Sequence, residues 1–161
     1  MCSSDLLASG VTASSLTSVG SLTALTVSGT STVQQTLELA TVSATAATGT
    51  INFDALTQAV LYYTSNASAN WTLNVRGSSG TSLNTMMSTG QSLTIVFLVT
   101  QGTTAYYPSA HQVDGSSITP KWQGGSAPTS GNASGIDAYV YTIIKTGSAT
   151  FTMLASQTQF K

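Results

Sequence analysis

Charge is scarce in this sequence of 161 residues, of which only 6% are Asp, Glu, Lys or Arg. The four cations, Arg76, Lys121, Lys145 and Lys161, are spread along the chain and form no basic cluster. A nucleic-acid-binding surface needs clustered cations to release the counterions of phosphate, so we expect no nucleic-acid partner. A near-neutral surface of hydroxyls and amides gives little repulsion between molecules, so we expect the chain to work in an assembly.

Long apolar runs are also missing. The longest covers residues 95–99, between Thr94 and Thr100, whereas a membrane helix needs about 20 apolar residues. We therefore expect no membrane span. The chain does not open with a basic segment followed by an apolar stretch, so no secretory signal is visible, which leaves open an intracellular origin or a truncated gene.

Cysteine occurs once, at Cys2, so a disulfide within the chain is excluded. Residues 1–6 (MCSSDL) resemble the translation of a sequencing adapter. We expect that these six residues do not belong to the natural chain, and we assign no role to Cys2.

The N-terminal part is a chargeless, low-complexity segment. Between Gly10 and Val33 the triplet Ser-Leu-Thr at residues 15–17 recurs at residues 21–23. The apolar residues here are too sparse to enclose a core, yet their exposure to water is costly, so other copies of the chain should cover them. We predict that residues 1–34 form an extended fibre shaft or arm; the alternative interpretation is a flexible Ser/Thr linker.

The remaining residues, 35–161, have the periodicity of β-strands around one core. Trp71, Leu73 and Val75 alternate with polar residues, which predicts a strand with one buried face. Residues 93–99 are almost continuously apolar, which predicts a central strand covered on both faces. Further strands are predicted at residues 51–53, 60–63, 139–144 and 151–153.

Turn signals separate these strands. Asp114-Gly115 predicts a tight hairpin turn, and residues 145–148 predict another. Helix signals are nearly absent. About eight short strands with frequent turns predict an all-β fold, a β-sandwich of jelly-roll type.

Several segments also have distinctive sequences: residues 101–110 (QGTTAYYPSA), 113–129 (VDGSSITPKWQGGSAPT), 141–146 (YTIIKT) and 151–160 (FTMLASQTQF). Together they resemble the C-terminal domain of tail-fibre and related structural proteins of marine tailed phages, notably cyanophages. The resemblance covers roughly residues 50–161, and residues 13–20 and 25–30 are similar to the shaft repeats of those proteins. It implies a homotrimeric virion component in a fibre that touches the host, made in the cytoplasm of the host bacterium.

No catalytic, cofactor or metal site is expected. His111 and Asp114 lie near many serines, but Ser is too common here to indicate a hydrolytic triad. One His and one Cys exclude an ordinary zinc site. The remaining metal hypothesis is that a trimer brings three copies of His111 or Asp114 to its axis.

Aromatic residues are the candidates for recognition. Tyr106, Tyr107 and Trp122 flank a Gly/Pro-rich segment, and exposed aromatic rings can stack on the sugars of a host receptor. The alternative interpretation of Trp122 is that it plugs the end of the sandwich core. If the chain binds a receptor, the loops at residues 116–133 are the expected place.

The sequence favours one class of function over two others. A virion structural protein, a trimeric tail-fibre-like appendage, accounts for the low charge, the chargeless repeat and the resemblance together. Its partners would be copies of itself, other virion proteins through the N-terminal segment, and a host surface glycan. The alternatives are a capsid decoration or head-fibre protein, and a secreted carbohydrate-binding or adhesin module; an enzyme is not expected.

Overall fold

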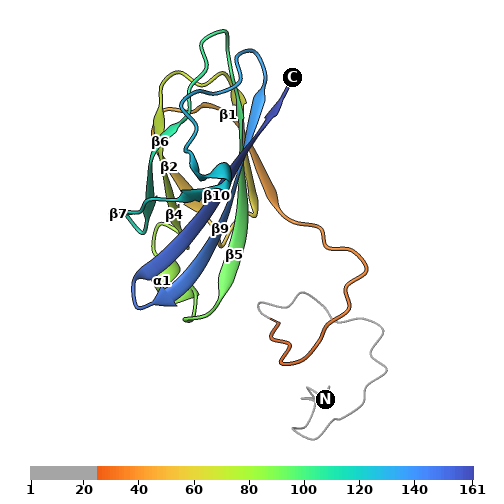
Figure 1. The fold of residues 1–161 in the computed structure, drawn as a ribbon. Helices are drawn as coiled ribbons and strands as arrows, with labels where there is room; N and C mark the ends of the chain where they lie inside the picture. Colours follow the sequence, from red (N-terminus) through yellow and green to blue (C-terminus); the bar gives the residue numbers. More distant parts are fainter. Residues whose placement is uncertain (1–24) are drawn as a thin grey trace, which may run out of the picture. The chain divides into compact units, whose positions relative to one another are not determined.

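The structure is a computed structural model that describes residues 25–161 (Figure 1). The predictions for residues 1–24, namely the non-native start, Cys2 and the Ser-Leu-Thr repeats, lie outside this range. The compact unit comprises Leu37–Lys161. No helix in the described part of the chain is long and apolar enough to cross a membrane.

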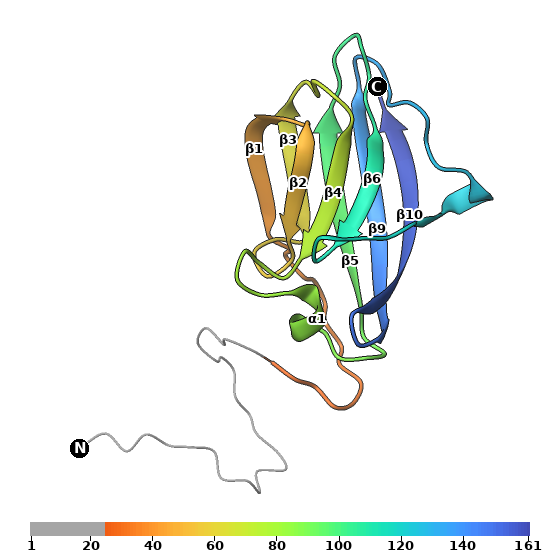
Figure 2. The ribbon, with the colours of Figure 1, turned by 90° about the vertical axis from the view of Figure 1, so that its left-hand side faces the viewer.

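Nearly all regular structure in the compact unit is β, as the sequence predicts. One sheet contains, in spatial order, β1 (Ala40–Ala46), β3 (Val60–Ser65), β5 (Ser92–Thr100), β9 (Ile136–Gly147), β10 (Thr150–Phe160) and β8 (Lys121–Trp122). The second contains β2 (Gly49–Asp54), β4 (Trp71–Arg76), β6 (Pro108–Val113) and β7 (Ser116–Ser117). The two sheets lie face to face, with β2, β4 and β6 in front of the larger sheet in Figure 2.

The connectivity differs from that of the predicted jelly roll, which consists of antiparallel strands. From β1 to β6 the chain alternates between the two sheets, so that β1, β3 and β5 are parallel neighbours, as are β2, β4 and β6. Only then do β9 and β10 add an antiparallel hairpin to β5. Apolar periodicity reports which face of a strand is buried but not which strand lies beside it, so the sequence could not predict this order.

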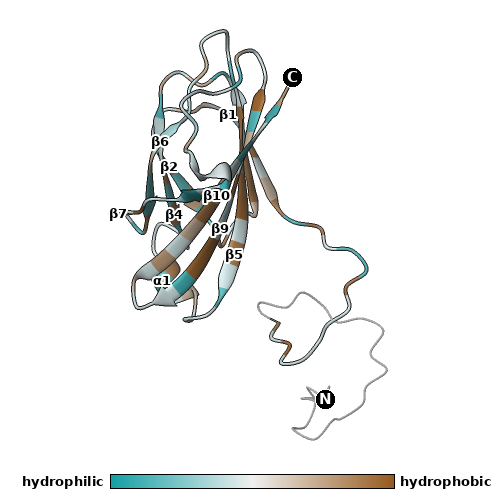
Figure 3. Ribbon diagram, viewed as in Figure 1, coloured by the Kyte–Doolittle hydropathy of each residue, from teal (hydrophilic) through white to brown (hydrophobic). Residues whose placement is uncertain are grey.

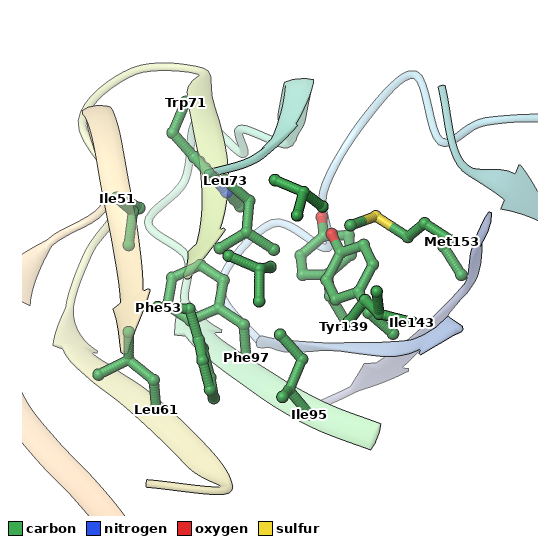
Figure 4. Packing of buried hydrophobic residues seen from close by; sticks show 14 of the residues in the cluster. Ile51, Phe53, Leu61, Trp71, Leu73, Ile95, Phe97, Tyr139, Ile143 and Met153 are labelled. Atoms are coloured by element: carbon green, nitrogen blue, oxygen red, sulfur yellow. The ribbon is translucent and has the colours of Figure 1, made fainter. Parts of the chain in front are cut away.

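The core lies between the sheets (Figure 4). Trp71 of β4 contacts Phe97 of β5 and Tyr139 of β9 edge to face, with 5.8 Å between ring centroids in each pair. Such pairs add about 0.5–1.5 kcal/mol beyond the burial of their area. As predicted, Trp71, Leu73 and Val75 all point into this core.

The prediction for β5 was half right. It is central, and Ile95, Phe97 and Val99 are fully buried. However, Val96 and Leu98 on its other face are only half-buried, so a single chain covers one face of this strand.

The described unit also contains two hairpin turns, the short helix α1 (Leu83–Met86) and a 3₁₀ helix, η1 (Gln123–Gly125). The β6–β7 hairpin turns at Asp114 and Gly115, whose φ values are 51° and 79°, as expected for a tight turn. The β9–β10 turn falls at Ser148 and Ala149, slightly later than predicted, because β9 continues to Gly147. Helix α1 (Leu83–Met86) was not predicted, because four residues are too few for a periodic signal.

Candidate functional site

A cleft of about 670 Å³ lies beside β6. Its walls are residues 108–111 of β6 and the segment 117–122, closed off by Gly125 and Ala127. This segment leaves β7, runs across the open side between the sheets and joins the edge of β10 through β8 (Figures 1 and 2). The cleft therefore lies within the loop region where the sequence placed receptor contact.

Trp122 forms the aromatic wall of the cleft. Its strand β8 pairs with β10, so that Trp122 lies opposite Ala155. The half-buried indole makes edge contacts with His111, Tyr139 and Tyr141, at centroid distances of 5.6, 6.5 and 6.1 Å. Trp122 is partly buried against the core, but at the open side between β6 and β10 rather than at the end of the sandwich, where the alternative interpretation of the sequence placed it.

His111 forms the floor of the cleft and is electrically neutral at pH 7. Its side chain is buried, and burial lowers its pKa from 6.5 to about 4. The Nε2 atom lies 3.1 Å from the Tyr141 hydroxyl. Burial, and secondarily the neighbouring Tyr139, raise the pKa of Tyr141, so this partner is neutral as well.

Tyr106 and Tyr107 do not join Trp122 in the cleft. Both are half-buried and lie just before β6, where the backbone of Tyr106 is held by Gln101. The backbone amide of Tyr107 donates to the Asn70 side chain over 3.1 Å. Of the three aromatic residues predicted to contact a receptor, only Trp122 lines the cleft.

Asp54 and Asp114, two carboxylates of the β domain, each hold part of the scaffold. Asp54 pairs with Arg76, with 2.6 Å between Oδ1 and Nε. Asp114 accepts the backbone amides of Leu83 and Asn84 over 2.6 and 2.9 Å, which holds the start of α1.

Asp137 is fully buried in a polar cluster that sequence reasoning missed. Its Oδ2 accepts from Gln101 Nε2 at 2.8 Å and from the Asn132 amide at 3.0 Å, and its Oδ1 accepts from Gln157 Nε2 at 3.1 Å. Gln157 donates also to the Tyr139 hydroxyl. These partners lie 5 to 36 residues from Asp137 along the chain, so no local motif could reveal the cluster.

The side chains proposed as ligands of a metal on a symmetry axis already have partners within the chain. Both Asp114 oxygens accept backbone amides, and His111 is buried with Nε2 facing Tyr141. Within residues 25–161, no group of three His, Cys, Asp or Glu side chains is placed to hold a metal ion.

The cleft thus combines one aromatic ring, a neutral imidazole, hydroxyls and backbone groups, with Lys121 as the charged residue at its rim. Such walls suit a ligand that presents both apolar patches and hydroxyls, as a saccharide does. Comparisons of the chain with protein-family models, with curated proteins and with solved structures give no match.

Proposed function

We propose that this chain is a structural protein of a phage virion, a trimeric tail-fibre-like appendage with the β domain as its tip. It is made in the host bacterium and carried on the particle, and its N-terminal segment joins it to other virion proteins. The resemblance of roughly residues 50–161 to tail-fibre domains of marine phages supports this proposal, as does the scarcity of charge.

The main support for the proposal is the exposure of apolar side chains in the segment that precedes β1. Residues 25–39 contain no helix or strand, and all of their apolar side chains are more than half exposed: Leu25, Val27, Val33, Leu37 and Leu39. Each exposed Leu or Val costs on the order of 1–3 kcal/mol relative to burial. Winding with identical segments of two other chains would bury them, which is how a fibre shaft is built.

Immunogold electron microscopy tests the proposal. An antibody against the β domain, applied to particles whose genome encodes the chain, is expected to label thin appendages at the tail. Label on the head alone would instead support a head fibre or capsid decoration protein. Particles without label, when the same antibody detects the protein in lysed host cells, would overturn the virion assignment.

Within this function, the cleft of Trp122 would contact a saccharide of the host surface. Ser117 lines the cleft and is exposed, whereas its neighbour Ser116 does not line it. Ser117→Arg should fill the cleft and abolish adsorption of fluorescently labelled protein to host cells, while Ser116→Arg should leave it unchanged. Equal adsorption by both variants would exclude the cleft as the contact site.

A further inference from the structure

The outward face of the six-stranded sheet is apolar where a solvent-facing sheet is normally polar. Strand pairing aligns two rows of side chains across it, which form what we name the outer apolar face: Val42, Tyr62, Leu98 and Ala138 in one row, and Val60, Val96 and Val140 in the next, with Leu154 beside them. Val42 is 65% exposed and Leu154 is 43% exposed. Figure 3 shows apolar segments along β5 and β9 in this sheet.

The second sheet provides an internal comparison, because its outward face is polar. Asn74 of β4 donates to Asn52 of β2 over 2.8 Å, and Arg76 pairs with Asp54 beside them. Thr50 and Thr72 occupy the next paired position. The same chain thus builds one sheet that suits water and one that does not, so low polarity is not a general property of its surface.

Strand β5 shows the same contrast within one element. The apolar run from Leu93 to Val99 is typical of a strand covered on both faces, and the chain covers only one of them. Val96 and Leu98, at the centre of the sheet, are therefore residue types typical of buried positions, but they lie on the face that the chain does not cover. Contiguous apolar surface of this kind marks an interaction site.

We infer that the outer apolar face is the surface through which β domains of identical chains associate, with three such faces turned toward a common axis. The inference rests on the proposed fibre function and specifies which surface of the tip joins the subunits. Five strands about 4.8 Å apart, each about seven residues long at a rise of about 3.4 Å per residue, have a whole outward face of roughly 600 Å², and the outer apolar face occupies its centre. A stable interface needs about 600–1,000 Å² from each partner.

The absence of charge and the shape of the surface favour a second copy of the chain as the partner of the outer apolar face. The outward positions of β1, β3, β5, β9 and β10 carry no charged residue. A charged partner would find no opposite charge on these strands, whereas an identical apolar face can pack against them. At the β8 edge, a hollow of about 390 Å³ lies beside Val140 and Leu154 and has Lys121 at its rim. A side chain from a neighbouring copy can enter this hollow.

The test is the solution mass of the full-length chain and of three variants, measured by light scattering over a range of concentrations. Val96→Lys and Leu98→Lys each place a charge at the centre of the face. Thr72→Lys is the matched control, because Thr72 occupies an outward position at the middle of the other sheet. Circular dichroism establishes that each variant is folded.

The expected result is three copies for the natural chain and for Thr72→Lys, and a single copy for both face variants. If the lysine variants do not fold, Val96→Thr combined with Leu98→Thr replaces them, and a weaker trimer is expected. Face variants that remain trimeric, or a natural chain that is a monomer, would overturn the inference. If the unmodified chain is a dimer and the face variants are monomers, the outer apolar face is still the interface, but the threefold symmetry of the proposed fibre is contradicted. The virion assignment is tested separately, by immunogold labelling.

Discussion

His111 of β6 and Tyr141 of β9 join the two sheets through one buried polar contact, with 3.1 Å between Nε2 and the hydroxyl oxygen. Their rings also pack together, with centroids 5.4 Å apart. Both side chains are buried, so the contact replaces hydrogen bonds to water that neither group can form. The sandwich therefore contains a polar bridge, beside the cleft, that depends on a neutral imidazole.

Acid should weaken the fold through His111. Its pKa is about 4 in the folded chain and about 6.5 when unfolded, so between these values the unfolded chain binds more protons and stability falls as the pH falls. The full effect is about 3 kcal/mol in the free energy of unfolding, complete below pH 4. Urea denaturation at pH 7 and pH 4.5 measures it. His111→Gln, whose amide can either donate to or accept from the Tyr141 hydroxyl, should show a smaller loss; an equal loss would assign the effect to other groups.

Lys145 should stabilise the domain, although it has no carboxylate partner within residues 25–161. It is buried, and its Nζ donates to the backbone carbonyls of Asn84 and Met87 over 2.6 and 2.8 Å, which holds the end of α1. Lys145→Met leaves these carbonyls without a donor, so we expect a loss of about 2–3 kcal/mol in urea denaturation. The exposed Lys121 is the control, and Lys121→Met should change stability by less than about 0.5 kcal/mol. Similar values for both variants would contradict the role of Lys145.

Gly131 should tolerate no side chain. A Cβ there would lie 2.6 Å from Gln101 Nε2 and 2.7 Å from Asp137 Oδ2, and would also collide with the Tyr106 carbonyl. Gly131→Ala must push the buried Asp137 cluster apart, so we expect a loss of about 3 kcal/mol in thermal or urea unfolding. Gly80→Ala, where nothing lies within 4 Å of the new Cβ, serves as the control. Equal melting temperatures for the two variants would show that the cluster can rearrange freely.

Removal of residues 1–36 should leave the β domain folded but weaken association. The cut spares Leu39, whose carbonyl accepts the amides of Ala59 and Val60. We expect a melting temperature within about 3 °C of the full chain at concentrations where both are monomeric, and a smaller trimer fraction at any given concentration. Fusion of an unrelated trimeric coiled coil in place of the segment should restore the trimer. A shortened chain that is unfolded would move the domain boundary toward the N-terminus.

The sequence predicted those features of the fold that depend on residues close to one another in the chain. Alternation placed Trp71, Leu73 and Val75 in the core, and Asp114-Gly115 fixed a turn, because both signals depend on neighbouring residues. It could not predict the neighbours of each strand or the Asp137 cluster, whose members are distant in sequence. The uninterrupted apolar run around Val96 did signal cover on both faces, but one chain supplies only one of the two covers.

The order of strands has a consequence for synthesis. Strand β5 lies in the middle of the larger sheet, yet its second neighbour, β9, begins only at Ile136, and β10 ends one residue before Lys161. Until β9 leaves the ribosome, β5 presents an open edge that can pair wrongly with other chains. A polypeptide that stops before Ile136 therefore lacks the strand that closes this side of β5, and its larger sheet keeps an edge that favours association with other unfinished chains.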